Sequence, residues 1–314
     1  MNVTPVVRCE RDTLPKVNTA PITLEASTFL LQWSTGGMLL GWVTTRRREV
    51  SLGYGWMLRL TYGPLAAGAV IAGFLYGSNL VRDAASALVA VTIGVAFVSS
   101  VVRKSAGVSG AQKEFDRRSE RVAAMTGIDR ATTRTAAGRE FHPILDLVPA
   151  MIGVVGLIAA GLAAASDGFL TDTLSVGRLL VGSLFLGAVT NAMLLGHWYL
   201  VQPGLPRKHL NELVDLLGKV WPFEVLVLIA PTGMVSVLNG SIDDGWGGVL
   251  GWFWVTCALT TIVLVVVTKA ALRERQYSAV MAATGLLYLA ILTAFGTDLV
   301  ARAILDAAVS TSAV

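Results

Sequence analysis

Eight long stretches without a charged residue constrain this chain more than any other feature. Each has 18 to 28 residues, and they cover 26–45, 60–81, 84–102, 147–166, 179–206, 225–242, 245–268 and 276–297. A helix of about 20 apolar residues crosses the hydrocarbon core of a bilayer. Only 15% of the residues are charged, against about 25% in soluble domains. We therefore predict an all-α, polytopic integral membrane protein with a single bundle of eight transmembrane helices.

The remaining charged segments divide the chain into five parts. We expect a short extracytoplasmic tail over 1–21, helices one to three within 22–102, and a charged, amphipathic helical segment in the cytoplasm over 103–141. Helices four to eight then lie within 142–303, followed by a short extracytoplasmic tail over 304–314. The first 21 residues are polar and have no apolar core, so they do not resemble a signal peptide.

The distribution of lysine and arginine predicts the orientation. The connections after the first, third, fifth and seventh stretches hold 19 basic residues, and the opposite side holds six. Basic loops remain in the cytoplasm, so we expect both termini on the extracytoplasmic side of the cell (inner or plasma) membrane. This count places Arg59 on the cytoplasmic side, and Arg82, Arg178 and Arg302 on the outer side. Because orientation explains the basic pI, we expect lipid and not nucleic acid as a partner.

Two histidines are candidates for a cofactor site. His142 precedes the fourth stretch in HPILDLVP, and His197 lies near the inner end of the fifth in LLGHWYLVQP. Consecutive helices joined by a short connection are antiparallel neighbours, so the two imidazoles are expected at one depth near the cytoplasmic leaflet. Two such ligands suit one haem b, whose iron is gripped from both faces. This predicts a subunit that transfers electrons or protons, with a quinone binding alongside.

Neighbouring residues fit the same hypothesis. The propionates of a haem need cationic partners, and Arg139, Arg207 and Lys208 lie close to the two histidines in sequence. Asp146 lies one turn after His142 and would orient its ring. As an alternative, these two histidines and Asp146 would form a two-histidine, one-carboxylate site for another metal. The plain structural alternative is that the histidines are a helix start and an interfacial anchor.

A second hypothesis, from a different functional class, is a secondary transporter or channel for a small solute or ion. Glu25 and Glu224 lie near opposite membrane faces in the predicted topology and would bracket a proton or cation path. Pro231 interrupts the sixth stretch, as in the broken helices of transporters. Carboxylates near helix ends are also often merely hydrated. Asp298 and Arg302 have the spacing of an intrahelical ion pair near the outer end of the last helix, which we interpret as structural.

A third hypothesis needs no chemistry in this chain. Its abundant glycine, 32 residues in total, lets helices pack closely in lipid, and exposed small-residue faces would dock other subunits of a larger membrane complex. The sequence contains no HExxH, GxSxG, Walker or paired-cysteine motif, so no enzyme class is indicated.

Overall fold

Every element of the structure is helical. The computed structural model describes residues 24–126, 139–164, 168–202, 205–230 and 233–312, and within these ranges it contains no strand. The elements are α1 (Ala26–Thr45), α2 (Leu52–Tyr76), α3 (Leu80–Val102), a 3-10 turn (Lys104–Ala106), α4 (Ser109–Thr126), α5 (Ile144–Ala164), α6 (Phe169–Val201), α7 (Lys208–Ile229), α8 (Gly233–Leu238), α9 (Val249–Arg273) and α10 (Tyr277–Ser312). The predicted all-α class is confirmed for the part of the chain that is described.

Six of the described helices are long and apolar enough to cross a membrane, namely α2, α3, α5, α6, α9 and α10. The structure is therefore compatible with a helical membrane protein, but the predicted count of eight spans is not supported. Helix α1 falls short because it carries several polar residues, and α7 falls short because it carries the charged residues Lys208, Glu212, Asp215, Lys219 and Glu224. Gln32 and Ser34 of α1 and Glu224 of α7 are fully buried. Polar groups in membrane helices usually face the bundle interior in this way.

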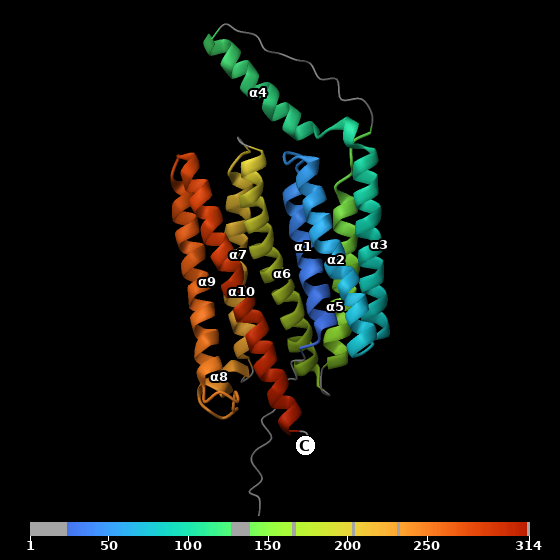
Figure 1. Cartoon of the computed structure of the whole chain (residues 1–314), viewed down its shortest axis with the longest axis vertical. Coiled ribbons are helices and arrows are strands. Elements are labelled where there is room, and N and C mark those ends of the chain that lie inside the picture. Colours follow the sequence, from blue (N-terminus) through green and yellow to red (C-terminus); the bar gives the residue numbers. More distant parts are fainter. Residues whose placement is uncertain (1–23, 127–138, 165–167, 203–204, 231–232, 313–314) are drawn as a thin grey trace, which may run out of the picture.

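The long helices run side by side in two groups (Figure 1). One group contains α1, α2, α3 and α5, and the other contains α6, α7, α9 and α10. Helix α6 joins them by packing against both α1 and α5. One hydrophobic core extends through both groups, from Leu31 and Tyr62 in the first to Val265 and Leu287 in the second. The chain thus forms a single bundle.

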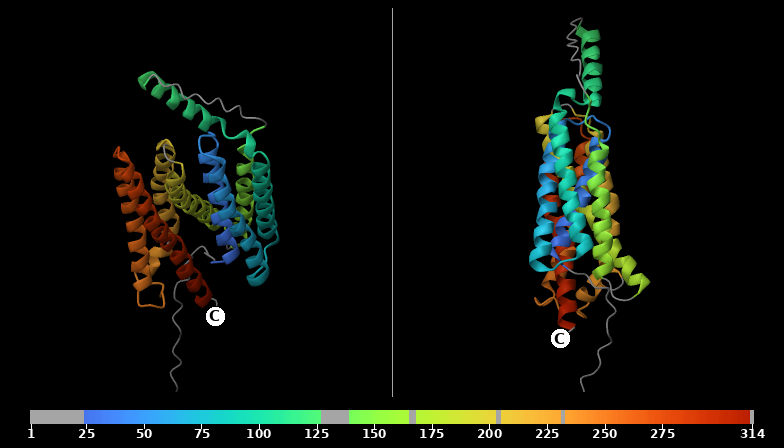
Figure 2. Two further views of the ribbon diagram at one scale, coloured as in Figure 1. Left: turned by 45° about the horizontal axis from the view of Figure 1, so that its top comes forward. Right: turned by 90° about the vertical axis from the view of Figure 1, so that its right-hand side faces the viewer.

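The two ends of the bundle differ. Helix α1 begins and α10 ends at the same end, whereas α4 lies beyond the opposite end (Figures 1 and 2). The connection Arg46–Val50 and the start of α7 lie at the α4 end. The arginines and lysines of these connections therefore gather at one end, which agrees with the charge distribution that the sequence predicts.

Glycines allow α1 to approach its neighbours very closely. A Cβ atom on Gly36 would lie 1.7 Å from the carbonyl oxygen of Ser183 on α6, and one on Gly37 would lie 2.1 Å from the ring of Tyr62 on α2. Across the same contact, a Cβ atom on Gly187 would lie 2.4 Å from the backbone of Gly36. Small residues at helix crossings permit such backbone contact. They place α1 at the centre of the molecule.

Side-chain caps define where two helices begin. Asn79 accepts a hydrogen bond from the backbone N–H of Arg82 (3.1 Å) at the start of α3. Asp244 accepts hydrogen bonds from the N–H groups of Gly248 (2.8 Å) and Leu250 (2.9 Å) at the start of α9. Carboxylate and amide oxygens at these positions satisfy N–H groups that have no partner within the helix.

Candidate functional site

Four arginines that lie outside the uncharged stretches, three of them expected in connections between helices, are buried inside helices. Arg59 lies in α2, Arg82 in α3, Arg178 in α6 and Arg302 in α10, and each side chain is almost inaccessible. The prediction was wrong because it assumed that every charge marks the end of a span. A buried charge is tolerated when a partner satisfies it, and each of these guanidinium groups has partners in neighbouring structure.

The candidate site is a cluster of charged residues where α7 and α10 meet. Glu224 of α7 is fully buried, and its carboxyl lies beside Asp298 and Arg302 of α10. Arg302 Nε donates to Asp298 Oδ1 at 2.9 Å, which confirms the predicted ion pair. Both residues are buried among the helices of the bundle. Both Glu224 oxygens and Asp298 Oδ2 are buried, and no donor group of the described residues reaches them, while the two carboxyls face each other.

Gln32 of α1 completes this cluster from the other half of the bundle. Its side chain is fully buried, and neither its amide nitrogen nor its amide oxygen has a hydrogen-bond partner. All these groups converge on Gly182 of α6. A Cβ atom there would lie 2.4 Å from Gln32 Nε2 and 3.0 Å from both Arg302 Nη2 and Asp298 Oδ1. Five buried polar atoms of the cluster therefore lack partners, which is unusual in a folded protein.

Arg178 of α6 closes the cluster on the side of α7. Its Nε donates to the carbonyl oxygen of Val227 at 2.8 Å, and its Nη2 donates to that of Ala230. These carbonyls lie at the end of α7, where the last C=O groups of a helix receive no N–H donor from within it. Arg302 Nη2 also donates to the carbonyl oxygen of Arg178 at 3.3 Å. The guanidinium of Arg178 thus binds the negative end of α7.

Glu25 lies at the end of the bundle opposite α4, where α1 begins. It precedes α1, accepts a hydrogen bond from Thr28 Oγ1 (2.9 Å) and forms an ion pair with buried Arg82. Arg82 also donates to Asp83 Oδ1 at 2.9 Å. About half of the Glu25 side chain is exposed, with a relative accessibility of 49%. Glu25 is thus the solvent-accessible end of a buried polar region.

The structure corrects the predicted placement of the two glutamates. Glu224 was expected at the start of a helix near the cytoplasmic face, but α7 begins at Lys208 and Glu224 lies 16 residues further on, about 24 Å along the axis. Glu25 and Glu224 therefore lie toward the same end of the bundle, where α1 begins and α7 ends, and not near opposite faces. Pro231, the predicted helix break, lies outside the described residues.

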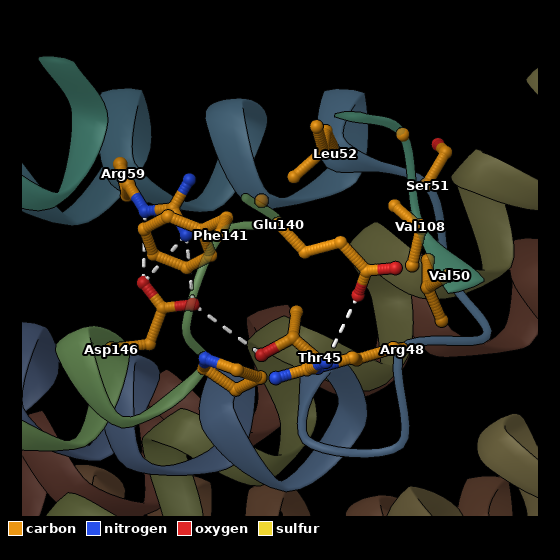
Figure 3. A pocket seen from close by; sticks show the side chains of 13 residues that line it. Thr45, Arg48, Val50, Ser51, Leu52, Arg59, Val108, Glu140, Phe141 and Asp146 are labelled. Atoms are coloured by element: carbon orange, nitrogen blue, oxygen red, sulfur yellow. Dashed lines mark hydrogen bonds and ion pairs between the residues drawn. The ribbon is translucent and has the colours of Figure 1, made fainter. Parts of the chain in front are cut away.

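Asp146 belongs to a second charged pair at the α4 end. Its carboxylate accepts hydrogen bonds from Arg59 Nε and Nη2, both at 2.8 Å, and the ring of Phe141 covers the guanidinium at 4.3 Å (Figure 3). A cavity of about 30 Å³ adjoins the pair, enough for about one water molecule. The hydrogen bonds of Asp146 go to Arg59 and Thr45, so it does not orient His142 as predicted.

The two histidines of the haem hypothesis lie on the surface. His142 is exposed in the connection before α5, and His197 is exposed on α6, where Nδ1 lies 3.3 Å from the Tyr288 hydroxyl of α10. Among the described residues, no group of three or more histidine, cysteine or acidic side chains is placed to hold a metal. The three predicted metal ligands are therefore not brought together. A haem held by the histidines alone stays a prediction, and two exposed rings give it no support.

The predicted propionate partners have other roles. Arg207 donates to the carbonyl oxygens of Glu274, Arg275 and Gln276 and so caps the end of α9. Lys208 forms an ion pair with Glu49 at 2.7 Å. Arg139 is exposed. Glu49, the partner of Lys208, also lies 2.7 Å from His209 Nε2. Ion pairs thus connect the helices at this end of the bundle.

Comparisons with protein-family models, curated proteins and solved structures give no match to this chain. The assignment of a function therefore depends on the geometry of the site.

Sequence reasoning identified Glu224 and the Asp298–Arg302 pair but missed Gln32, Gly182 and Arg178 as their partners. Gln32 carried a signal, since it lies in the polar face of α1. The contact of Arg178 with α7 carried none, because residues 49 positions apart meet only through tertiary packing.

Proposed function

We propose that this chain is a multi-pass membrane protein that transfers protons through the buried carboxyl of Glu224. The observation that carries the proposal is the set of unpartnered oxygens on Glu224 and Asp298 within the bundle. Ionisable groups within membrane helices are costly and commonly belong to ion pathways or proton relays. Proton transfer is common to the first two hypotheses drawn from the sequence, and it needs no histidine ligand.

The charges of the cluster favour a proton on Glu224. Arg302 is neutralised by Asp298, and Arg178 binds the carbonyl end of α7. An ionised Glu224 would be a further negative charge without a hydrogen bond, and such a buried group usually takes up a proton. The neutral acid remains close to Arg302 and Asp298. It is therefore able to release its proton to a neighbouring acceptor, and Arg302 lies close enough to stabilise the anion.

The proposed setting is a cell membrane in which the α4 end faces the cytoplasm and both termini face outward. Exposed or partly exposed basic residues at the α4 end support this orientation, including Arg46, Arg47, Lys104 and Lys208. Lipid is the expected partner of the apolar surfaces of α3, α5 and α9, where many valines and leucines are exposed.

Proton flux into liposomes tests the proposal. Purified protein is reconstituted with a trapped pH-sensitive dye, and a potassium gradient with valinomycin supplies the driving voltage. We expect wild-type protein to acidify the lumen and Glu224→Gln to lower the rate about a hundredfold, the scale of a lost proton-transfer group. Glu212→Gln is the control, because Glu212 lies on the same helix but is partly exposed and pairs with Arg46 and Arg47. Wild-type flux equal to that of empty liposomes would refute the proposal.

A further inference from the structure

We infer that protons reach Glu224 from the end of the bundle where α1 begins, along a buried row formed by Glu25, Thr28 and Gln32. This inference rests on the proposed function and adds the route and the selectivity of the transfer. The three residues are spaced by three and four positions, so they lie on one face of α1. The row runs from a half-exposed carboxylate to the amide that faces Asp298 and Arg302.

The outer part of the row is already hydrogen-bonded. Glu25 accepts from Thr28 Oγ1 at 2.9 Å, and Arg82 Nη1 lies 3.3 Å from the same hydroxyl. Thr28 and Arg82 are buried, whereas Glu25 is half exposed. Solvent protons therefore meet the row at a carboxylate, and the Thr28 hydroxyl, which both donates and accepts, is the next group along the row.

The inner part of the row ends at the carboxyl cluster. Gln32 is one helical turn beyond Thr28, a rise of about 6 Å, which a single bridging water spans. The Gln32 amide contains a donor and an acceptor, and neither has a partner in the described structure. The missing side chain of Gly182 leaves the space in which this amide meets Asp298 and Arg302. No other residue type fits at position 182 without displacing one of them.

The charges along the row favour protons over metal cations. Arg82 lies at its outer part and Arg302 at its inner end, and both guanidinium groups are buried. Each is paired with a carboxylate, Arg82 with Glu25 and Arg302 with Asp298, so oxygens that a sodium or potassium ion would need as ligands already bind a guanidinium group. A proton moves instead by exchange along hydrogen bonds and needs no site of its own. We therefore expect flux that does not change when sodium replaces choline in the buffer.

A matched pair of glycine substitutions on α6 tests the route. Gly182→Ala places a methyl group against Gln32, Asp298 and Arg302, whereas a Cβ atom at Gly177 meets nothing within 4 Å. In the liposome assay we expect Gly182→Ala to lower proton flux about tenfold or more, because the methyl group displaces the Gln32 amide and a shift of about 1 Å can cost about a hundredfold in rate. Gly177→Ala should keep the wild-type rate. Gln32→Leu should reduce flux to a similar extent without adding volume to the site.

The possible outcomes separate the route from the proposed function. If Gly182→Ala does not yield a monodisperse protein by size-exclusion chromatography, the flux of Gln32→Leu alone tests the route. Wild-type flux in both Gly182→Ala and Gln32→Leu, with flux lost in Glu224→Gln, would overturn the route and leave the proposed function intact. No flux in wild-type protein would overturn both. Flux that rises with sodium concentration would contradict the selectivity.

Discussion

Charged side chains inside this bundle differ in how completely they are satisfied. Arg59 and Asp146 form two short hydrogen bonds with each other, and Phe141 shields them from solvent (Figure 3). Such a pair is expected to link α2 to α5. Glu224 has no comparable partner, and the difference separates a structural ion pair from a group that is able to exchange a proton.

At the α4 end, His209 makes stability sensitive to acid. Burial lowers the pKa of His209 from its usual 6.5, despite the contact with Glu49, and Lys208 and Arg47 lower it further. Burial raises the pKa of Glu49, but hydrogen bonds from Lys208 and His209 lower it more, so that it lies below its usual 4.5. In both cases the unfolded chain binds protons more readily than the folded one.

The sign of the pH effect follows from this difference. Because the unfolded state takes up more protons, the free energy of unfolding decreases as pH falls. The contribution of His209 is complete above pH 6.5 and decreases below it, and that of Glu49 decreases below pH 4.5. We expect the unfolding temperature in detergent to fall between pH 7 and 5. His209→Gln should flatten this part of the curve, and an unchanged slope would contradict the assignment.

At the scale of the helix, glycine contacts explain why α1 is central although it is less apolar than α2, α3 and α5. Ser34 donates to the carbonyl oxygen of Tyr62 at 2.9 Å, and Asn191 of α6 donates to that of Gly37 at 3.0 Å. These bonds and the close backbone approach hold α2 and α6 on either side of α1. Ser34 and the backbone carbonyl of Gly37 therefore find hydrogen-bond partners inside the bundle.

Gly36→Ala tests this packing. Its methyl group would lie 1.7 Å from the carbonyl oxygen of Ser183, so α1 and α6 would have to separate. Overpacking in a protein interior commonly costs about 1–3 kcal/mol, and a backbone contact should place this change at the upper end. We expect a clear fall in the unfolding temperature, measured in detergent. Gly94→Ala on α3, where a Cβ atom meets nothing within 4 Å, should not lower the unfolding temperature, because alanine favours a helix over glycine. Equal stability of the two variants would refute the role.

Helix positions were predicted better than helix ends. The uncharged stretch 26–45 matches α1, and every other stretch overlaps a helix. The ends were wrong where a charge lies inside the bundle. Helix α2 begins at Leu52 and includes Arg59, and α7 begins at Lys208 and includes Glu224. Uncharged stretches in a sequence indicate where the chain is apolar. They do not indicate which charged residues find partners inside the bundle.

At the scale of the whole molecule, the sequence predicted a helical bundle with its basic residues at one end. It did not predict the cluster, because Gln32, Gly182, Glu224 and Asp298 come from four helices and meet only when α1 packs against α6. His142 and His197 suggested a redox site because they were expected at one depth, with basic residues close to them in the sequence. In the structure both are exposed, and the buried polar groups are carboxyls, an amide and guanidinium groups.

Infrared spectroscopy measures the proton on Glu224 most directly. A protonated buried carboxyl has a carbonyl stretching band separate from that of a carboxylate, and the band shifts when deuterium replaces the proton. We expect wild-type protein in lipid at neutral pH to show such a band. The band should be absent from Glu224→Gln, and in Gln32→Leu its shift in heavy water should be slower than in wild type. A wild-type spectrum without this band, or a band that survives in Glu224→Gln, would contradict a proton carried by Glu224.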